Sequence, residues 1–217
     1  MEDRPLQEIT PKERILKRIR EALTAAPITV ERAIDLDSSV FVPAGATLDV
    51  VFAENFVHSR GGQFVYCENM EEAVQSLLYL ADENQWHGNI FCRDESVEHI
   101  LQWAGIPYGK EPVDGVLTSV GVCSCRCLVA NDGSILFDSV SAGRRIFAQA
   151  DTVIFIALSE QIMPDLRTFW KTQQADSLPS MMSLWTGLSH FVDVDGIPMQ
   201  GFGPKNIYLV LIDQIEQ

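Results

Sequence analysis

Apolar residues in the first half of the chain recur with spacings that predict alternating helices and strands. Helices are predicted over Leu48–His58, Met70–Asn84 and Asp94–Ala104, where apolar side chains follow the helical period and the last segment opens on an aspartate suited to an N-cap. The short apolar runs Gln63–Cys67 and Asn89–Cys92 predict strands between them. This order of strand, helix, strand and helix favours a parallel sheet flanked by helices.

A stretch of the second half, Gly121–Asp138, is predicted to form two strands that meet at the tight turn Asn131–Ser134. The turn contains Asn, Asp and Gly, which tolerate the positive φ of a chain reversal. On the first strand, Cys123, Cys125 and Cys127 occupy every second position. Strand geometry therefore predicts that all three thiols face one side.

The remainder of the chain is predicted to hold three more strands and one more helix. The strands are expected at Thr152–Leu158, Ser189–Val194 and Asn206–Ile212, and a helix capped by Ser159 is expected to run through Trp170. Residues 1–26 are expected to form a helical extension, because a threonine, a proline and a glutamate at positions 10, 11 and 13 match a capping box. Residues 27–217 are then one α/β domain.

Charge and composition narrow the classes of function. The 217-residue chain carries 16 basic and 30 acidic residues, a net charge of −14, which would repel nucleic acid and anionic membrane surfaces. No apolar segment has the roughly 18 residues of a membrane span, and a cytoplasmic location is expected. The cysteine count of 5 is odd, and buried thiols in a reducing compartment are expected rather than a disulfide framework.

The thiols of the first strand are a poor metal site. On an extended strand, neighbours in the C-x-C-x-C pattern lie roughly 6–7 Å apart, too far for one tetrahedral ion. The same spacing argues against an iron–sulfur cluster within this chain. No metal is therefore predicted, and the thiols are interpreted as small buried side chains or, alternatively, as a nucleophile that would need a lowered pKa.

Two other segments carry candidate chemistry. The small-residue loop Ser141–Arg145 ends in two arginines, whose guanidinium groups suit a carboxylate or phosphate, although solvated arginines at a helix start explain the pattern equally well. Asp193 and Asp195 alternate with apolar residues, so they would share one strand face and could serve acid–base chemistry. A plain polar strand edge is the alternative. No P-loop, G-x-S-x-G motif or dinucleotide-binding glycine pattern after a strand is present.

The order of these segments resembles the LUD-domain family, the group that includes lactate utilization protein C. Gly121–Ser134 follows the family pattern G-I-T-x-A-x-x-A-I-A-[DE]-T-G-[ST] without a gap, with cysteines at two of its positions. The residues Gly143–Arg145 resemble the family's arginine motif. Gly187–Gly196 resembles the family's G-P-S-x-T-x-D-I-E-G motif, and Gly201–Pro204 resembles a shortened form of its G-x-x-G-P motif. Leucine and histidine stand at positions 188 and 190, where the family has proline and arginine.

The resemblance implies a three-layer α/β/α fold with a mostly parallel sheet, similar to the NagB/RpiA/CoA-transferase group, preceded by an N-terminal helix. It implies a role beside iron–sulfur partner proteins in oxidising lactate to pyruvate, with homo-oligomers left open. We therefore expect an accessory component of a lactate-utilisation system that binds a small anionic metabolite. The alternatives are a transferase or isomerase acting on an acyl-CoA or sugar phosphate, and a non-catalytic interaction subunit.

The candidate site combines three segments of the chain. Asp193 and Asp195 are the catalytic candidates in the enzyme hypothesis, and no cofactor is assigned. The expected ligand-binding residues are Asn131, Asp132, Gly133, Ser134, Ser141, Gly143, Arg144, Arg145, Gly187, Ser189 and His190.

Overall fold

A computed structural model describes most of the chain beyond residue 46. The described residues are 16, 17, 20, 47–86, 88–112, 119–173, 178–188, 190–192, 198–201 and 203–213, and at 190–192 and 198–200 only the backbone is described. Contacts divide the chain into two units, Met1–Val40 and Phe41–Gln217. The predicted N-terminal helix lies almost wholly outside the described residues, so the fold below is that of the second unit.

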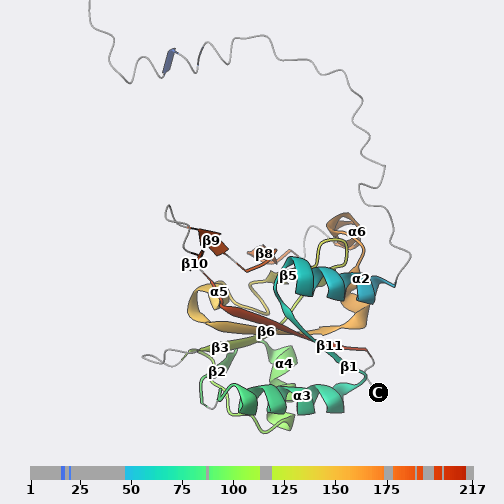
Figure 1. Cartoon of the computed structure of the whole chain (residues 1–217), viewed down its shortest axis with the longest axis vertical. Helices are drawn as coiled ribbons and strands as arrows, with labels where there is room; N and C mark the ends of the chain where they lie inside the picture. Colours follow the sequence, from blue (N-terminus) through green and yellow to red (C-terminus); the bar gives the residue numbers. More distant parts are fainter. Residues whose placement is uncertain are drawn as a thin grey trace, which may run out of the picture. The chain divides into compact units, whose positions relative to one another are not determined.

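A five-stranded parallel sheet forms the centre of this unit (Figure 1). Its order is β1-β11-β6-β3-β2, and every neighbouring pair is parallel. The central strands are continuous apolar runs because both faces of the sheet are covered. The strands are β1 (Gln63–Cys67), β2 (Ile90–Cys92), β3 (Val120–Ser124), β6 (Thr152–Leu158) and β11 (Asn206–Ile212).

Two helices, α3 (Met70–Glu83) and α4 (Glu95–Trp103), cover one face of the parallel sheet (Figure 1). Both begin at side-chain caps, since Asn69 accepts a hydrogen bond from the N–H of Glu72 and Asp94 accepts one from that of Ser96. The apolar stripes of both helices pack on the sheet. The predicted strands and helices of residues 63–104 are thus confirmed to within two residues at their ends.

A second sheet and several short helices cover the other face (Figure 1). Its order is β7-β4-β5-β8, and the turn before β5 is the predicted chain reversal. The helices α3 and α4, the parallel sheet and the elements on its other face make the mostly parallel three-layer α/β fold that was expected. The layer on that other face contains the four-stranded sheet as well as helices. Its elements are α2 (Leu48–Glu54), the π-helical turn η1 (Asn55–Ser59), β4 (Cys127–Val129), β5 (Ser134–Asp138), α5 (Ile146–Gln149), β7 (Ile162–Met163), α6 (Leu166–Thr172) and β8 (Met182–Trp185).

The cysteine-bearing strand is not continuous, so the prediction that its three thiols share one face is wrong. The chain leaves the parallel sheet after Ser124 and joins the second sheet at Cys127. Cys123 and Cys125 are buried between the sheets, whereas Cys127 lies in a separate apolar cluster with Phe169. Alternation of faces holds only along an unbroken strand, and the bend changes which side the last thiol faces.

The helix predicted from Ser159 to Trp170 is also wrong. A 3-10 turn, η2 (Ser159–Gln161), leads into β7, and α6 begins only after Asp165, whose side chain accepts a hydrogen bond from the N–H of Thr168 at 2.6 Å. Pro164 explains the interruption, because proline supplies no N–H and forces the preceding residue into an extended conformation.

A second hairpin lies near the end of the chain. Strands β9 (His190–Val192) and β10 (Pro198–Gln200) pair antiparallel, and β9 falls within the predicted strand Ser189–Val194. The pattern predicted β11 with its observed bounds but did not predict β7, β8 or β10. Each of these missed strands has four residues or fewer, too short for a periodic signal.

The turn before β5 generates a stability prediction. Gly133 has φ +68°, and a Cβ there would lie 2.5 Å from the backbone nitrogen of Phe56. Gly133→Ala should lower the free energy of unfolding by about 2–5 kcal/mol, the sum of backbone strain and overpacking. Gly105→Ala is the matched control, because φ is +64° but no atom lies within 4 Å. It should cost only about 1–2 kcal/mol. Equal losses in urea unfolding would show that the close approach to Phe56 is unimportant.

Candidate functional site

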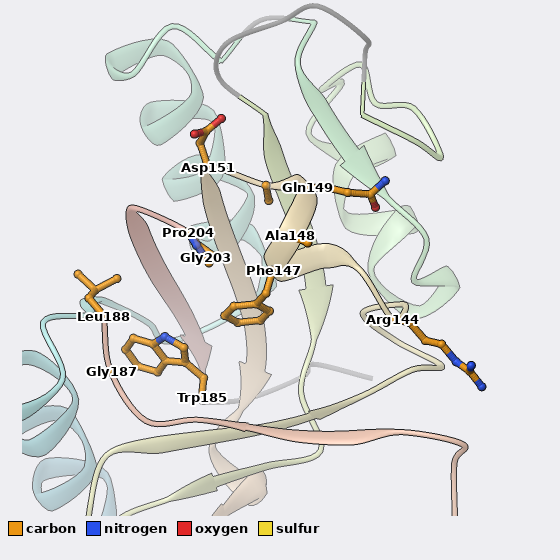
Figure 2. Close-up of a pocket in the computed structure, with 11 residues that line it drawn as sticks. Arg144, Phe147, Ala148, Gln149, Asp151, Trp185, Gly187, Leu188, Gly203 and Pro204 are labelled. Carbon is orange, nitrogen blue, oxygen red and sulfur yellow. The ribbon is translucent and has the colours of Figure 1, made fainter. Parts of the chain in front are cut away.

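A pocket of about 560 Å³ lies between α5 and the segment that follows β8 (Figure 2). We call it the α5 pocket. It sits at the amino ends of two central strands, since Asp151 directly precedes β6 and Pro204 lies two residues before β11. Its lining residues are Arg144, Phe147, Ala148, Gln149, Ala150, Asp151, Trp185, Gly187, Leu188, Gly203 and Pro204.

Aromatic side chains make the walls of the α5 pocket. Phe147 stacks on Phe137, with ring centroids 4.7 Å apart and planes 15° apart. Trp185 packs against Phe56 with centroids 5.4 Å apart and is only 6% exposed. Figure 2 shows Phe147, Trp185 and Leu188 around one space. Because their partners belong to the buried core, these walls are held in place before any ligand arrives.

The Asp151 carboxylate stiffens the edge of the pocket. One oxygen pairs with the Lys205 ammonium at 3.3 Å, and the other accepts a hydrogen bond from the N–H of Ser119 at 3.2 Å. The Asp151 carbonyl also accepts from the N–H of Lys205 at 2.6 Å. These contacts join the chain entering β6 to the chain entering β11.

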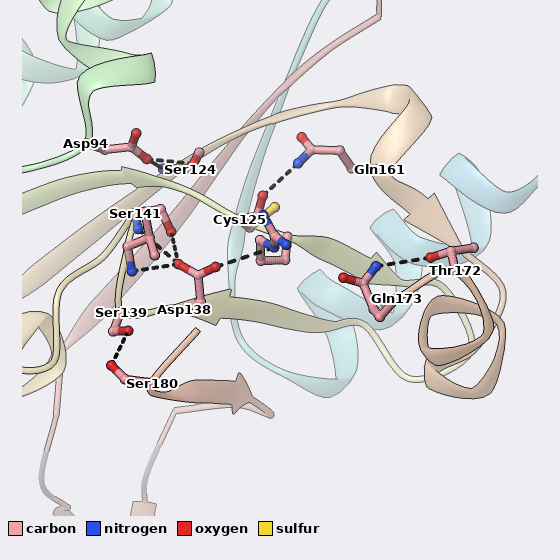
Figure 3. A network of polar contacts seen from close by, with 12 residues as sticks. Asp94, Ser124, Cys125, Asp138, Ser139, Ser141, Gln161, Thr172, Gln173 and Ser180 are labelled. Atoms are coloured by element: carbon pink, nitrogen blue, oxygen red, sulfur yellow. Dashed lines mark hydrogen bonds and ion pairs between the residues drawn. The ribbon is translucent and has the colours of Figure 1, made fainter. Parts of the chain in front are cut away.

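The predicted loop Ser141–Arg145 is shaped by Asp138, the last residue of β5 (Figure 3). This carboxylate is 2% exposed and accepts hydrogen bonds from the N–H groups of Val140 and Ser141 at 2.8 and 3.0 Å. The Ser141 hydroxyl donates to the same oxygen, and the Arg126 guanidinium lies 3.4 Å from the other oxygen. Asp138 therefore sets the path of the loop that carries Arg144 to the pocket.

Arg144 lies at the rim of the α5 pocket, and Figure 2 shows its guanidinium directed away from the aromatic walls. It donates a hydrogen bond to the Ser180 hydroxyl at 2.9 Å, and Ser180 in turn contacts the Ser139 hydroxyl at 3.0 Å. Within the described ranges, no carboxylate lies within ion-pair distance of Arg144. Gly143 lies beside Arg93, and Arg145 is exposed without lining the pocket.

The predicted turn Asn131–Ser134 does not line the α5 pocket. It is packed against η1, where Asn55 donates to the Ala130 carbonyl at 2.9 Å. The Ser134 hydroxyl is buried and has no hydrogen-bond partner among the described residues. The turn therefore lies outside the pocket and packs on η1.

Arg60 connects this turn to the pocket wall. Its Nε donates to the Asp132 carbonyl at 2.7 Å, and its guanidinium lies 3.6 Å from the Asp132 carboxylate. Its own carbonyl accepts from the N–H of Leu188 at 3.2 Å. Gly187 lies against Arg60 with φ +132°, a conformation that other residues rarely adopt. Two of the predicted segments are thus joined by a residue that the sequence pattern did not single out.

The remaining predicted residues are only partly described. Ser189, Asp193 and Asp195 lie outside the described residues, and His190 is described only as part of β9. Sequence reasoning missed Phe147 and Trp185, whose apolar side chains look like ordinary core residues. Gly203 and Pro204 could have been found, because they belong to the shortened G-x-x-G-P motif.

The cysteines are buried thiols. Burial raises the pKa of Cys92 and of Cys127 to about 12, and it also raises the pKa of the fully buried Cys123 and Cys125. No group of three or more metal-ligating side chains occurs in the part of the chain that is described. The thiols therefore stay protonated near neutral pH and are poor nucleophiles.

The described residues of the second unit form a three-layer α/β domain with a mostly parallel sheet. Residues 115–212 match the family model of the LUD domain, which confirms the resemblance to the LUD-domain family over that segment. No curated protein matches the chain in sequence. Among the described helices, none combines the length and apolarity needed to cross a membrane.

A solved structure supports the same fold. The chain is similar to a DUF162 family protein from Deinococcus radiodurans, whose crystal structure was determined at 1.70 Å resolution. The TM-score is 0.52 at 12% sequence identity, and the match covers 76% of this chain and 96% of that chain. At this identity the likeness concerns the fold alone.

The loop that carries Arg144 generates a second prediction. Asp138→Ala should lower the free energy of unfolding by about 2–4 kcal/mol, because the buried N–H of Ser141 and the partly buried N–H of Val140 lose their acceptor. Arg126→Ala removes only the half-exposed ion pair and should cost about 1 kcal/mol or less. Chemical unfolding measures the free energy of unfolding of both variants. An equal decrease in the two variants would mean that the ion pair, rather than the backbone hydrogen bonds to Asp138, holds the loop.

Thiol reactivity provides a third prediction. At about pH 8, an aromatic disulfide reagent should react with the cysteines only as fast as the chain unfolds. In the unfolded chain the thiols titrate near their ordinary pKa of 9.0, whereas burial raises the pKa of the folded thiols and keeps them protonated at that pH. The free energy of unfolding should therefore fall as the pH rises past 9.0, because the unfolded chain then loses thiol protons that the folded chain retains. Chemical unfolding at a series of pH values measures this decrease. Rapid labelling of the native chain would contradict the burial.

Proposed function

We propose that this chain is an accessory component of a lactate-utilisation system and that it binds a small anionic metabolite in the α5 pocket. One observation carries the proposal: Arg144 and Gly187, which come from two separate family-like motifs, line the same pocket. They lie 43 positions apart in the sequence (187 − 144). Each is a candidate ligand-binding residue on sequence grounds alone.

The chemistry of the rim favours an anion. Arg144 brings a permanent positive charge to the pocket rim, and among the described residues its guanidinium bonds to Ser180 alone, so other guanidinium N–H groups can bind a ligand. Among the described lining residues Asp151 is the one carboxylate, and it is already paired with Lys205. A local positive site can therefore exist in a chain whose net charge is −14.

The size of the pocket sets an upper limit on the ligand. A volume of about 560 Å³ falls within the range of small-molecule sites. Lactate and pyruvate would occupy only part of it, with the carboxylate at Arg144. A phosphorylated or CoA-linked metabolite could also place its carbon skeleton against Phe147 and Trp185.

The proposed setting is a complex with iron–sulfur proteins that oxidise lactate to pyruvate. This part of the proposal rests on the match of residues 115–212 to the LUD-domain family model and on no contact seen in the structure. In this setting the electron transfer belongs to the partner proteins, and the present chain binds the metabolite.

Arg144→Ala tests the proposal. In the unaltered chain, lactate, pyruvate or a phosphorylated or CoA-linked metabolite should raise the midpoint of thermal unfolding, because a ligand that binds only the folded state stabilises it. The variant should lose the shift, since removing a charged partner weakens binding by about tenfold or more.

Lys171→Ala is the charge-matched control. Lys171 is an exposed cation of α6 that does not line the pocket, so its variant should keep the full thermal shift. An identical shift for Arg144→Ala and the unaltered chain would reject the assignment of Arg144. Failure of every anion in the set to shift the midpoint would reject anion binding in this pocket.

A further inference from the structure

A second pocket, of about 380 Å³, lies at the opposite ends of the central strands. We call it the carboxyl-edge pocket. It lies at the carboxyl ends of β3, β6 and β11, beside the first turns of α3 and α4. Its polar lining includes Ser96, Ser124 and Glu160, and its apolar lining includes Ile100, Leu158 and Ile212.

The position of the carboxyl-edge pocket is typical of ligand sites. In open α/β sheets, ligands bind outside the carboxyl ends of the parallel strands. The α5 pocket lies at the amino ends of β6 and β11, so the two pockets are at opposite edges of the same sheet. They are therefore separate sites.

Asp94 determines which hydrogen bonds this pocket can offer. The carboxylate is 6% exposed, and the Ser96 and Ser124 hydroxyls each donate to one of its oxygens at 2.6 Å. Figure 3 shows the contact with Ser124. A serine hydroxyl has one hydrogen, and Asp94 takes it in both cases. Only the oxygen lone pairs of these serines remain, so both groups face the pocket as acceptors.

The backbone donors near the pocket are also occupied. The N–H of Ser96 donates to the Asp94 carboxylate at 3.0 Å, and the N–H groups of Val97 and Glu98 donate to the Asp94 carbonyl. The first turn of α4 therefore keeps few of the free N–H groups that would bind an anion.

The remaining polar groups of the lining point to the same chemistry. Gln161 donates to the Cys125 carbonyl at 2.6 Å and accepts from the N–H of Leu158 at 2.7 Å. Glu160 adds an exposed carboxylate, and His99 can accept a hydrogen bond when neutral. Acceptors and negative charge thus surround an apolar floor.

We propose that the carboxyl-edge pocket binds an organic ammonium ion with an apolar tail. The ammonium group donates to the Ser96 and Ser124 hydroxyl oxygens and to the Glu160 carboxylate. The tail lies against Ile100, Leu158 and Ile212. The pocket discriminates against carboxylates of the same shape, because it offers acceptors where a carboxylate needs donors.

Three small probes test this preference on the full-length chain. Hexylammonium has both the charge and the tail, hexanoate has the same tail with the opposite charge, and methylammonium has the charge without the tail. Ligand-observed NMR should show hexylammonium binding with a Kd on the order of 1 mM, as expected for so few atoms. Methylammonium and hexanoate should bind at least about tenfold more weakly. Hexanoate binding as tightly as hexylammonium would overturn the proposal, and so would the absence of hexylammonium binding.

Substitutions localise the binding. Glu160→Gln should weaken hexylammonium binding by about threefold, the effect of one exposed ion pair, and Ser124→Ala by about fivefold, the effect of one hydrogen bond. Glu95→Gln removes an exposed carboxylate at the start of α4 that does not line the pocket, and it should have no effect. Because Ser124→Ala also removes a hydrogen-bond partner of Asp94, thermal unfolding must show that the variant is folded. If Ser124→Ala does not fold, the affinity of Glu160→Gln for hexylammonium decides the test.

Equal affinities of hexylammonium for Glu160→Gln and Glu95→Gln would mean that the cation binds the acidic surface in general, and this result would overturn the proposal. Arg144→Ala should leave hexylammonium binding unchanged, since Arg144 belongs to the α5 pocket. Failure of the anion proposal and failure of the ammonium proposal are therefore distinguishable.

Discussion

The apolar contact between the parallel sheet and the second sheet supports the rest of the structure. Phe155 of β6 is fully buried in this contact and packs on Phe137 of β5, with ring centroids 5.6 Å apart. Burial of one such side chain contributes about 1.5–3 kcal/mol. The aromatic rings continue from this contact to Phe147, and a second aromatic group of the same apolar cluster joins Phe56 to Trp185. The walls of the α5 pocket are thus the outer part of the core, which explains why a small domain can keep a pocket open.

Buried polar side chains set the paths of the loops at both edges of the sheet. Asp138 holds the loop that carries Arg144, and Asp94 joins the start of α4 to the end of β3. Arg60 does the same between the turn of β4–β5 and the chain after β8. Asp94 and Arg60 connect segments distant in sequence, Arg60 through both its side chain and its backbone carbonyl, whereas Asp138 binds backbone N–H groups two and three residues away. The polar groups at the pockets are consequently positioned by contacts that lie beneath the surface.

The sequence pattern predicted long elements well and short ones poorly. The runs that became β6 and β11 have seven residues each, and their bounds were predicted as observed. The cysteine strand failed because the pattern could not show that the chain changes sheets between Ser124 and Cys127. The helix expected after Ser159 failed because its apolar spacing was interpreted without the effect of Pro164. Strand β8 was missed, although it carries Trp185 to the pocket.

The sequence by itself determined the parallel α/β class, the resemblance to the LUD-domain family and the candidate loop with its arginines, because these depend on local periodicity and on motif order. It also singled out Arg144 and Gly187 as candidate ligand-binding residues. Only the tertiary structure decided that these two line one pocket and that the turn Asn131–Ser134 lies outside it, connected to it through Arg60. The same holds for the acceptors of the carboxyl-edge pocket, which depend on Asp94 binding two serines 28 positions apart (124 − 96). Such proximity arises from sheet order and core packing, which no local pattern encodes.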